Sequence, residues 1–377
     1  MQGGPLHQLS WAIGLPRGPS GFLCLGVAMA LLTWLPLFVL AASAQTLTSG
    51  SSVPFLPSLG THVRLLIAIP LLFIAEVRFD HRVRNAVRAI GSQLVPTEQL
   101  PRLRTALAQA ATWRDAWIVE AALLALAIFL IREGVRGDLP GEITTWRSTP
   151  GGQTTLAGWW YVLVSLPLFQ FLAWRWSARL LIWWQLLWRI RRLDLQLLPT
   201  HPDLAGGLGP FGGAHESLAP LNVAATSIMA ATFAEEIIHG HTGIREVVLP
   251  LAAVVIANTI VLLAPLLTFA PKLYEAKHRG LAEYGALASG YTRAFERKWL
   301  RSEAPPVEPL LGSADVQSLA DLANGFNVIR RMRFVPIARH QVLFLVSAAV
   351  APAAPLILFV IPLDELVIRG LETIFPL

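Results

Sequence analysis

Charged side chains interrupt three apolar stretches of this sequence at comparable positions. The set comprises Glu76, Arg78, Asp80, Asp115, Glu120, Arg175 and Arg179. Arg175 and Arg179 are four residues apart, so on a helix they share one face. An unpaired charge in hydrocarbon costs at least about 2.5–3.5 kcal/mol, so such groups pair with one another or face water. The set predicts either an ion or proton path or a layer of structural salt bridges between helices.

A second group of ionisable residues has the spacing of metal ligands. The segment AEEIIHGH contains Glu235, Glu236, His239 and His241. Glu235 and His239 lie one helical turn apart, a spacing that can hold a divalent metal. The other interpretation is a polar helix end closed by Gly240, because the sequence identifies no further ligands for a tetrahedral site.

The segment LLPTHPDLAGGLGPFGGAHES, residues 197–217, lies between two apolar runs and is rich in proline and glycine. Proline fixes φ and interrupts a helix, whereas glycine permits left-handed backbone. Asp203 can cap the short turn that follows it. We interpret the segment as a rigid structural elbow, with an anion nest or a small metal site as the alternatives. The residues assigned to the elbow are His201, Pro202, Asp203, Gly206 and Gly207.

Several motifs of enzymes and binding proteins are absent from the sequence. It contains no HExxH zinc motif, no G-x-S-x-G nucleophile elbow and no G-x-x-x-x-G-K-[ST] phosphate loop. Its one cysteine, Cys24, excludes a disulfide within the chain. The isoelectric point near 10.1 does not indicate nucleic acid, because membrane proteins collect basic residues on their cytoplasmic side. We predict no cofactor and no nucleic-acid partner, and an enzyme is the weaker class.

Composition identifies the elements that would position these residues. Mean hydropathy is +0.55, and 14% of residues are charged, against about 25% in soluble domains. Because lipid offers no hydrogen bonds to the backbone, the apolar stretches are predicted as helices. We predict an all-α polytopic transmembrane bundle in a single integral membrane domain, residues 1–377, with about seven spans. The spans lie near 22–44, 63–77, 113–131, 158–176, 218–238, 247–269 and 342–361.

The distribution of basic residues predicts the orientation. With the N-terminus in the cytoplasm, 24 of the 30 lysines and arginines fall on the cytoplasmic side. Helices are expected to extend into the cytoplasm at 78–112, 177–217 and 272–339. The first apolar run, Phe22–Leu40, precedes AASAQ, which mimics a signal-peptidase site. Because this run is longer than the apolar core of a signal peptide, we interpret it as a retained span.

Two resemblances bear on these predictions. The segment RLDLQLLPTHPDLAGGLG, within residues 192–211, resembles a motif of uncharacterised bacterial multispanning membrane proteins. That resemblance implies a bacterial inner-membrane protein and says nothing about catalysis. The predicted plan also resembles that of insect odorant-receptor channels, a likeness of topology without a shared motif.

From these features we predict an integral membrane transport protein, and more narrowly an oligomeric ion channel with its last span near the pore. The last span contains Pro352, Pro355 and Pro362 among small residues, so it can bend and line a gap. The alternative is a non-conducting scaffold or sensor that acts through basic cytoplasmic helices. Its partners would be anionic lipids at the cytoplasmic face or an acidic protein.

The predicted orientation can be tested by cysteine labelling in intact cells. A cysteine at Ser49 should react from the periplasm, whereas a cysteine at Ser302 should react only after the membrane is opened. Labelling of the Ser302 position in intact cells would show that the orientation is wrong.

Overall fold

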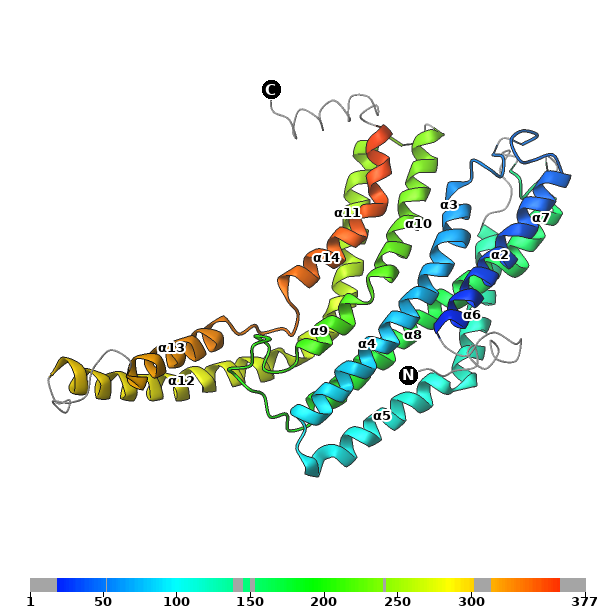
Figure 1. Cartoon of the computed structure of the whole chain (residues 1–377). Coiled ribbons are helices and arrows are strands. Elements are labelled where there is room, and N and C mark those ends of the chain that lie inside the picture. The colour runs from blue at the N-terminus through cyan, green and yellow to red at the C-terminus, as the bar shows by residue number, and fades with distance from the viewer. Residues whose placement is uncertain are drawn as a thin grey trace, which may run out of the picture.

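The computed structural model describes residues 19–51, 53–137, 145–149, 153–239, 242–301 and 313–359. These residues form an all-α bundle, which confirms the predicted fold class. Extended pairing within them is confined to isolated bridges at Val53, Thr145, Ser148 and Thr154, so the described chain contains no β-strand. Figure 1 shows an upright bundle from whose base a helical hairpin leaves sideways.

Five helices within the described residues are long and apolar enough to cross a bilayer. They are Pro19–Ser43, Leu59–Gln93, Leu156–Arg191, Gly209–Ile238 and Arg245–Leu300. The first is α2 (Pro19–Ser43), and the second runs through α3 (Leu59–His62), η1 (Val63–Ala68) and α4 (Ile69–Gln93). The third runs through α7 (Leu156–Trp160), η3 (Tyr161–Ser165) and α8 (Leu166–Arg191), and the fourth through α9 (Gly209–Glu216) and α10 (Ala219–Ile238). The fifth runs through α11 (Ile244–Leu263), η4 (Ala264–Phe269), α12 (Ala270–Phe295) and η5 (Glu296–Leu300). The predicted count of about seven spans is not confirmed.

The span predicted at 113–131 is shorter in the structure. The helix breaks at Ala116, whose extended backbone separates α5 (Leu100–Asp115) from α6 (Trp117–Gly137). A short turn, η2 (Thr97–Gln99), precedes α5. The apolar part of α6 ends at Ile131 and has fewer than the roughly 20 residues that a helix needs to cross hydrocarbon.

The span predicted at 342–361 also differs from an uninterrupted helix. It begins as α14 (Arg339–Val350) and continues as a 3₁₀ segment, η6 (Ala351–Phe359). Pro352 and Pro355 have no amide hydrogen to donate, so the regular α-helical hydrogen bonds cannot continue through them. The predicted interruption by proline is therefore present in the described part of this region.

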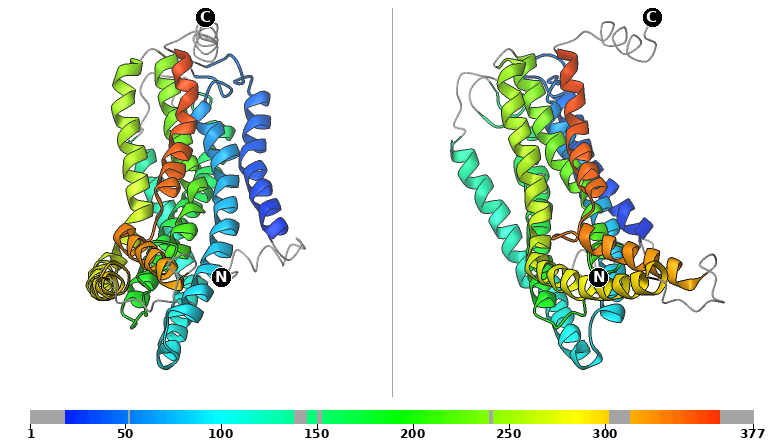
Figure 2. Two further views of the ribbon diagram at one scale, coloured as in Figure 1. Left: turned by 60° about the vertical axis from the view of Figure 1, so that its left-hand side comes forward. Right: turned by 90° about the vertical axis from the view of Figure 1, so that its left-hand side faces the viewer.

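Helices α4 and α8 run together through the middle of the bundle. α2 packs along α4 and η1, and α10 packs against the same two elements. α10 also contacts α11, α14 and η6, so the C-terminal helices gather around it. α5 and α6 pack against α8. In the left view of Figure 2, α2 and α11 accordingly lie at opposite edges of the bundle.

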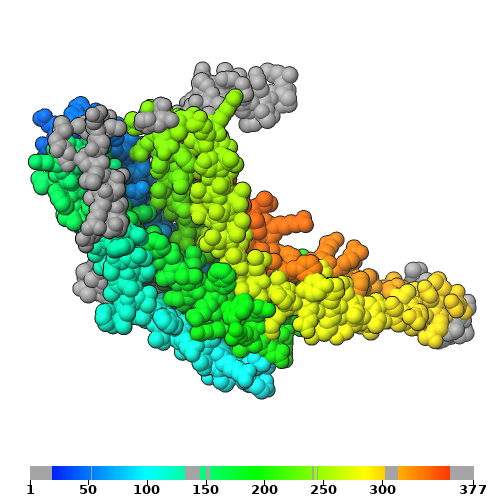
Figure 3. All heavy atoms as spheres, turned by 180° about the vertical axis from the view of Figure 1, so that it is seen from behind, coloured from blue at the N-terminus to red at the C-terminus, as the bar shows by residue number. Residues whose placement is uncertain are grey.

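A hairpin of α12 and α13 (Ala314–Arg331) projects from the base of the bundle, as the space-filling view in Figure 3 shows for α12. The two helices are joined at their outer end through Asp315. Its carboxylate accepts hydrogen bonds from Lys298 Nζ at 2.8 Å and Trp299 Nε1 at 3.0 Å. The hydrogen bond from Lys298, followed by that from Trp299, lowers the pKa of the Asp315 carboxyl group.

The proline- and glycine-rich segment forms a turn that is organised by Asp203. One oxygen of its carboxylate accepts hydrogen bonds from the amides of Ala205 and Gly207, at 2.8 and 3.1 Å. The other oxygen accepts from the amide of Gly209 at 2.8 Å, at the start of α9. Gly206 and Gly207 have φ of 64° and 95°, a conformation that glycine adopts without strain.

This turn also contacts the distant helices around it. Gly207 packs against Leu94, the residue that follows α4. The amide of Arg333, just beyond α13, donates to Leu204 O at 2.7 Å, and the guanidinium of Arg333 donates to Asp203 O. The turn therefore holds the ends of α4, α9 and α13 in one place.

Replacing Gly207 with valine tests whether the turn is rigid. A Cβ at this position would lie 2.8 Å from Leu94 Cδ2, and the backbone would keep a strained positive φ. We expect Gly207→Val to lower the free energy of unfolding by about 1–3 kcal/mol, measured by thermal unfolding in detergent.

The matched control is Gly290→Val, on α12, where an added Cβ meets no atom within 4 Å. It should change the unfolding free energy by no more than about 0.5 kcal/mol, since valine is no worse than glycine in a helix. Equal unfolding temperatures for the two variants would contradict the rigid turn.

Candidate functional site

The predicted charged residues of three helices meet in a buried ion-pair network. The guanidinium of Arg175 binds both carboxylate oxygens of Glu76, at 2.6 and 3.1 Å, and its Nε lies 3.2 Å from Glu120. Arg179 Nη1 lies 2.5 Å from Glu76 Oε1, the oxygen that Arg175 Nη2 also contacts, as a charge contact rather than an aligned hydrogen bond. Its Nη2 lies 3.5 Å from Asp80. The two arginines thus share Glu76 between them.

Helical spacing explains why these side chains meet. Glu76 and Asp80 lie one turn apart on α4, and Arg175 and Arg179 lie one turn apart on the facing side of α8. Glu120 comes from the first turn of α6, which packs on α8. All four side chains on α4 and α8 are less than 9% exposed. The network therefore replaces water as the partner of these charges.

Trp176 supports the network from within α8. Its Nε1 donates to Leu72 O at 3.1 Å, one turn before Glu76 on the neighbouring helix. The guanidinium of Arg179 lies over the Trp176 ring, 5.6 Å from its centroid. These contacts fix the register between α4 and α8 at the level of the ion pairs.

Arg78 and Asp115, which the sequence groups with this set, do not join the network. Asp115 forms its ion pair with the adjacent Arg114, at 2.6 Å. Arg78 lies two residues from Glu76, and two residues turn a helix by about 200°. Its side chain therefore leaves α4 on a different face from Glu76.

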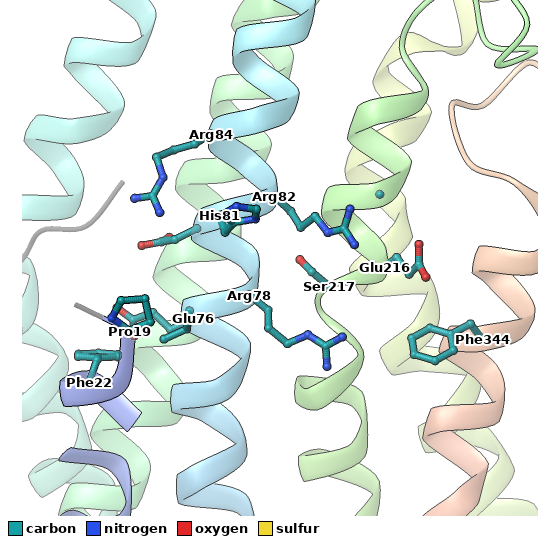
Figure 4. Close-up of a pocket in the computed structure, with 13 residues that line it drawn as sticks. Pro19, Phe22, Glu76, Arg78, His81, Arg82, Arg84, Glu216, Ser217 and Phe344 are labelled. Carbon is teal, nitrogen blue, oxygen red and sulfur yellow. The ribbon is translucent and has the colours of Figure 1, made fainter. Parts of the chain in front are cut away.

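A crevice of about 340 Å³ opens between α2, α4, α9 and α14. Figure 4 shows Arg78 and Arg82 pointing from α4 towards Glu216 and Ser217, and Phe344 of α14 beyond them. Glu76 and Asp80 also reach its wall, so this α4–α9 crevice borders the network.

A smaller crevice of about 200 Å³ lies between α5 and α8. Its walls include Arg114, Arg179 and, again, Asp80. Asp80 is therefore a wall residue of both crevices. Of its partners in the network, Glu76 lines the α4–α9 crevice and Arg179 lines the α5–α8 crevice.

The four residues predicted as metal ligands are not gathered into a site by the described chain. Glu235 instead accepts a hydrogen bond from the amide of Gly60 at 2.8 Å and so joins α10 to α3. His239 Nδ1 lies 2.7 Å from the carbonyl oxygen of Glu235. Glu236 lies near Thr242, and His241 falls outside the described residues. Within the described residues, no group of three or more His, Cys, Asp or Glu has the geometry of a metal site.

Among the elbow residues, His201 and Pro202 contribute little to the packing. His201 Nδ1 lies 2.7 Å from the Asp203 carboxylate, and Pro202 is exposed. Asp203, Gly206 and Gly207 make the contacts described above. The geometry of this segment is that of a structural turn.

Sequence reasoning gave no structural role to His215, which is fully buried between three helices. Trp183 Nε1 of α8 donates to His215 Nε2 at 2.9 Å. The proton of the imidazole therefore resides on Nδ1, which lies 2.6 Å from Leu262 O of α11. The sequence could not identify this role because both partners are remote along the chain.

No protein-family model, curated protein or solved structure matches this chain. The site must therefore be interpreted from its own geometry. That geometry comprises a buried ion-pair network, two bordering crevices and five helices of membrane-crossing length among the described residues.

Removing Arg175 tests the energetic role of the network. Arg175→Ala would leave Glu76 and Glu120 without their shared partner, so we expect a loss of about 3–5 kcal/mol in unfolding free energy. Arg147→Ala is the control, because within the described residues the Arg147 guanidinium stacks over the rings of Trp146 and Tyr161 and forms no ion pair. Its loss should be about 0.5–1 kcal/mol. Thermal unfolding in detergent measures both.

A double-mutant cycle on Glu76→Gln and Arg175→Gln completes this test. If the pair acts as a unit, the double variant should be less destabilised than the sum of the two single variants. Strict additivity, or equal stability of the Arg175 and Arg147 variants, would show that the network does not couple α4 to α8.

Proposed function

We propose that this chain is a membrane transport protein, in which an ion path runs past the buried ion-pair network. The observation that carries the proposal is the position of Asp80, which lines both the α4–α9 and the α5–α8 crevice. Arg179 lies between the carboxylates of Asp80 and Glu76, at 3.5 and 2.5 Å. Asp80 thus borders both spaces, and its partner Arg179 lines the α5–α8 crevice.

A path closed by side chains opens with small rearrangements. If Arg179 moved away from Asp80, it would free that carboxylate to exchange a proton or to face water from both crevices. The short contact between Arg179 and Glu76 favours the closed arrangement. Buried ionisable groups at membrane depth commonly mark such paths. The network is in this proposal a gate, and its ion pairs hold the closed state.

The narrower proposal is an oligomeric channel of the bacterial inner membrane, with the N-terminus in the cytoplasm. It is supported by α14, whose Leu343 is 65% exposed and whose Phe344 and Val350 are also exposed. An apolar helix face that the described residues leave uncovered suits contact with lipid or a second copy. The proline-containing η6 follows directly, as expected of a segment that bends beside a pore.

A second candidate is a scaffold or sensor at the membrane surface. The α12–α13 hairpin favours it, because the hairpin projects from the bundle and exposes Tyr274, Leu287 and Leu300. Basic residues lie close to these apolar ones on the same helices, among them Arg279 and Arg297. That combination suits an anionic membrane surface. In this candidate the network would be purely structural.

Flux measurements in liposomes distinguish the two candidates. We expect the full chain to raise proton or chloride flux above that of protein-free liposomes. Arg179→Gln should change this flux several-fold, because the ion pair of Arg179 with Asp80, which borders both crevices, is lost. Arg102→Gln, on the exposed face of α5, is the control and should leave the flux unchanged.

The same preparation should contain an oligomer when its mass is measured by native mass spectrometry. Flux at the protein-free level for the wild type would exclude transport of these ions and favour the scaffold. Flux from a preparation that is entirely monomeric would contradict the oligomeric channel alone.

A further inference from the structure

Three arginines of α4 that the ion-pair network does not use line the α4–α9 crevice: Arg78, Arg82 and Arg84. Figure 4 shows that Arg84 points away from Glu216 and Ser217, whereas Arg78 and Arg82 point towards them. Arg78 and Arg82 lie one turn apart on α4, and both side chains are exposed to the crevice. Neither forms an ion pair with any residue in the described part of the chain. Two guanidiniums at this spacing can together bind one phosphate or carboxylate group.

The acidic residues of the crevice leave this positive charge in excess. Glu76 and Asp80 also line the crevice, but both are paired with arginines of α8. Glu216 faces Arg78 and Arg82 from α9, and its carboxylate accepts a hydrogen bond from Gln341 at 3.2 Å. One carboxylate therefore stands against two guanidiniums, which favours an anion in the space between them.

Four apolar side chains also line the crevice, beside the polar His81 and Ser217. Phe22 and Pro19 of α2, Val77 of α4 and Phe344 of α14 contribute to its walls. On the α9 side, a Cβ added to Gly213 would meet no atom within 4 Å, so space remains open there. A ligand that fills this crevice therefore needs a charged end and an apolar body.

The charged end and the apolar walls together identify the ligand class. We propose that the α4–α9 crevice is a binding site for an anionic phosphate-bearing amphiphile, with its phosphate between Arg78 and Arg82 and its hydrocarbon part against Phe344 and Val77. A membrane phospholipid with an anionic headgroup has this chemistry. The proposal is independent of the transport function, because it requires only the crevice and its two free arginines.

A small hydrophilic anion fits the crevice less well. Inorganic phosphate could bind the guanidiniums but would leave the apolar walls in water. It would therefore gain none of the free energy of roughly 25 cal/mol for each Å² of apolar surface that a lipid chain would remove from water. A zwitterionic lipid would bring the apolar part, but its headgroup cation would face the arginines. Both alternatives are distinguished from an anionic lipid by direct binding measurements.

Native mass spectrometry of the full chain in detergent is the test, with phosphatidylglycerol, phosphatidylcholine and inorganic phosphate as probes. Arg78→Gln with Arg82→Gln removes the proposed phosphate ligands. The matched control is Arg88→Gln with Arg104→Gln, which removes the same charge from exposed positions outside the crevice.

A second pair of variants tests the space rather than the charge. Gly213→Leu adds a side chain to the open side of the crevice, where an added Cβ meets no atom within 4 Å. Gly290→Leu is its control on α12, where the surroundings are equally open. Thermal unfolding without added lipid shows that each variant is folded before its binding is compared.

We expect wild-type protein to bind phosphatidylglycerol more tightly than phosphatidylcholine or inorganic phosphate. The double Arg78 and Arg82 variant should weaken phosphatidylglycerol binding at least about tenfold, because two charge-assisted hydrogen-bonding groups are lost. Gly213→Leu should also weaken it, whereas both controls should stay within about twofold of the wild type.

Three results would overturn the proposal. Equal loss of binding in the Arg88 and Arg104 control would show that only overall charge matters. Unchanged phosphatidylglycerol binding in the Arg78 and Arg82 variant would place the lipid elsewhere. Inorganic phosphate that binds as tightly as the lipid would show that the site recognises a free anion. None of these results depends on ion flux, so none of them decides whether the protein is a transporter.

Discussion

The structure depends on the need to neutralise charges inside an apolar helix bundle. Glu76 and Asp80 on α4 cannot remain ionised in hydrocarbon without partners, and Arg175 and Arg179 on α8 provide them. A salt bridge of this kind contributes less to net stability than it does to specificity, because burying its charges is costly. In the observed register of α4 against α8, all four groups are paired. α2 and α10 pack on α4, and α6 packs on α8.

Helix α4 has different roles on its different faces. Glu76 and Asp80, which pair with α8, alternate along the same two turns with Arg78 and Arg82, which point into the α4–α9 crevice, at an offset of two positions. This arrangement places an electrically satisfied cluster next to arginines that are not satisfied within the described chain. A purely structural salt-bridge layer would not need the second pair. This contrast between Arg78 with Arg82 and the paired groups supports the proposal of ligand binding in the crevice.

The turn around Asp203 and the α12–α13 hairpin form the base of the bundle. Asp203 organises a turn whose glycines let Leu94 and Met332 approach closely, so the ends of several helices converge on it. The α12–α13 hairpin starts from this anchored region and extends away from the bundle. A rigid base with a projecting hairpin suits a membrane surface, whichever function the bundle performs.

The sequence by itself determined the all-α class and most of the long apolar helices, because hydropathy and helical periodicity are local properties. It also identified the charged residues of three helices as one set, since isolated charges in hydrocarbon require partners. It could not separate Arg78 and Asp115 from that set, because the face from which a side chain leaves depends on how the helices rotate against one another. It placed a span across Ala116, where the break in the helix leaves too short an apolar segment. The spacing of possible metal ligands around Glu235 is likewise a property of one short segment. In the structure the Glu235 carboxylate accepts a hydrogen bond from the amide of Gly60, which is remote in the sequence. Tertiary structure alone brought His215 between Trp183 and Leu262 and opened the crevice beside Arg78 and Arg82, because both depend on contacts between residues far apart in the chain.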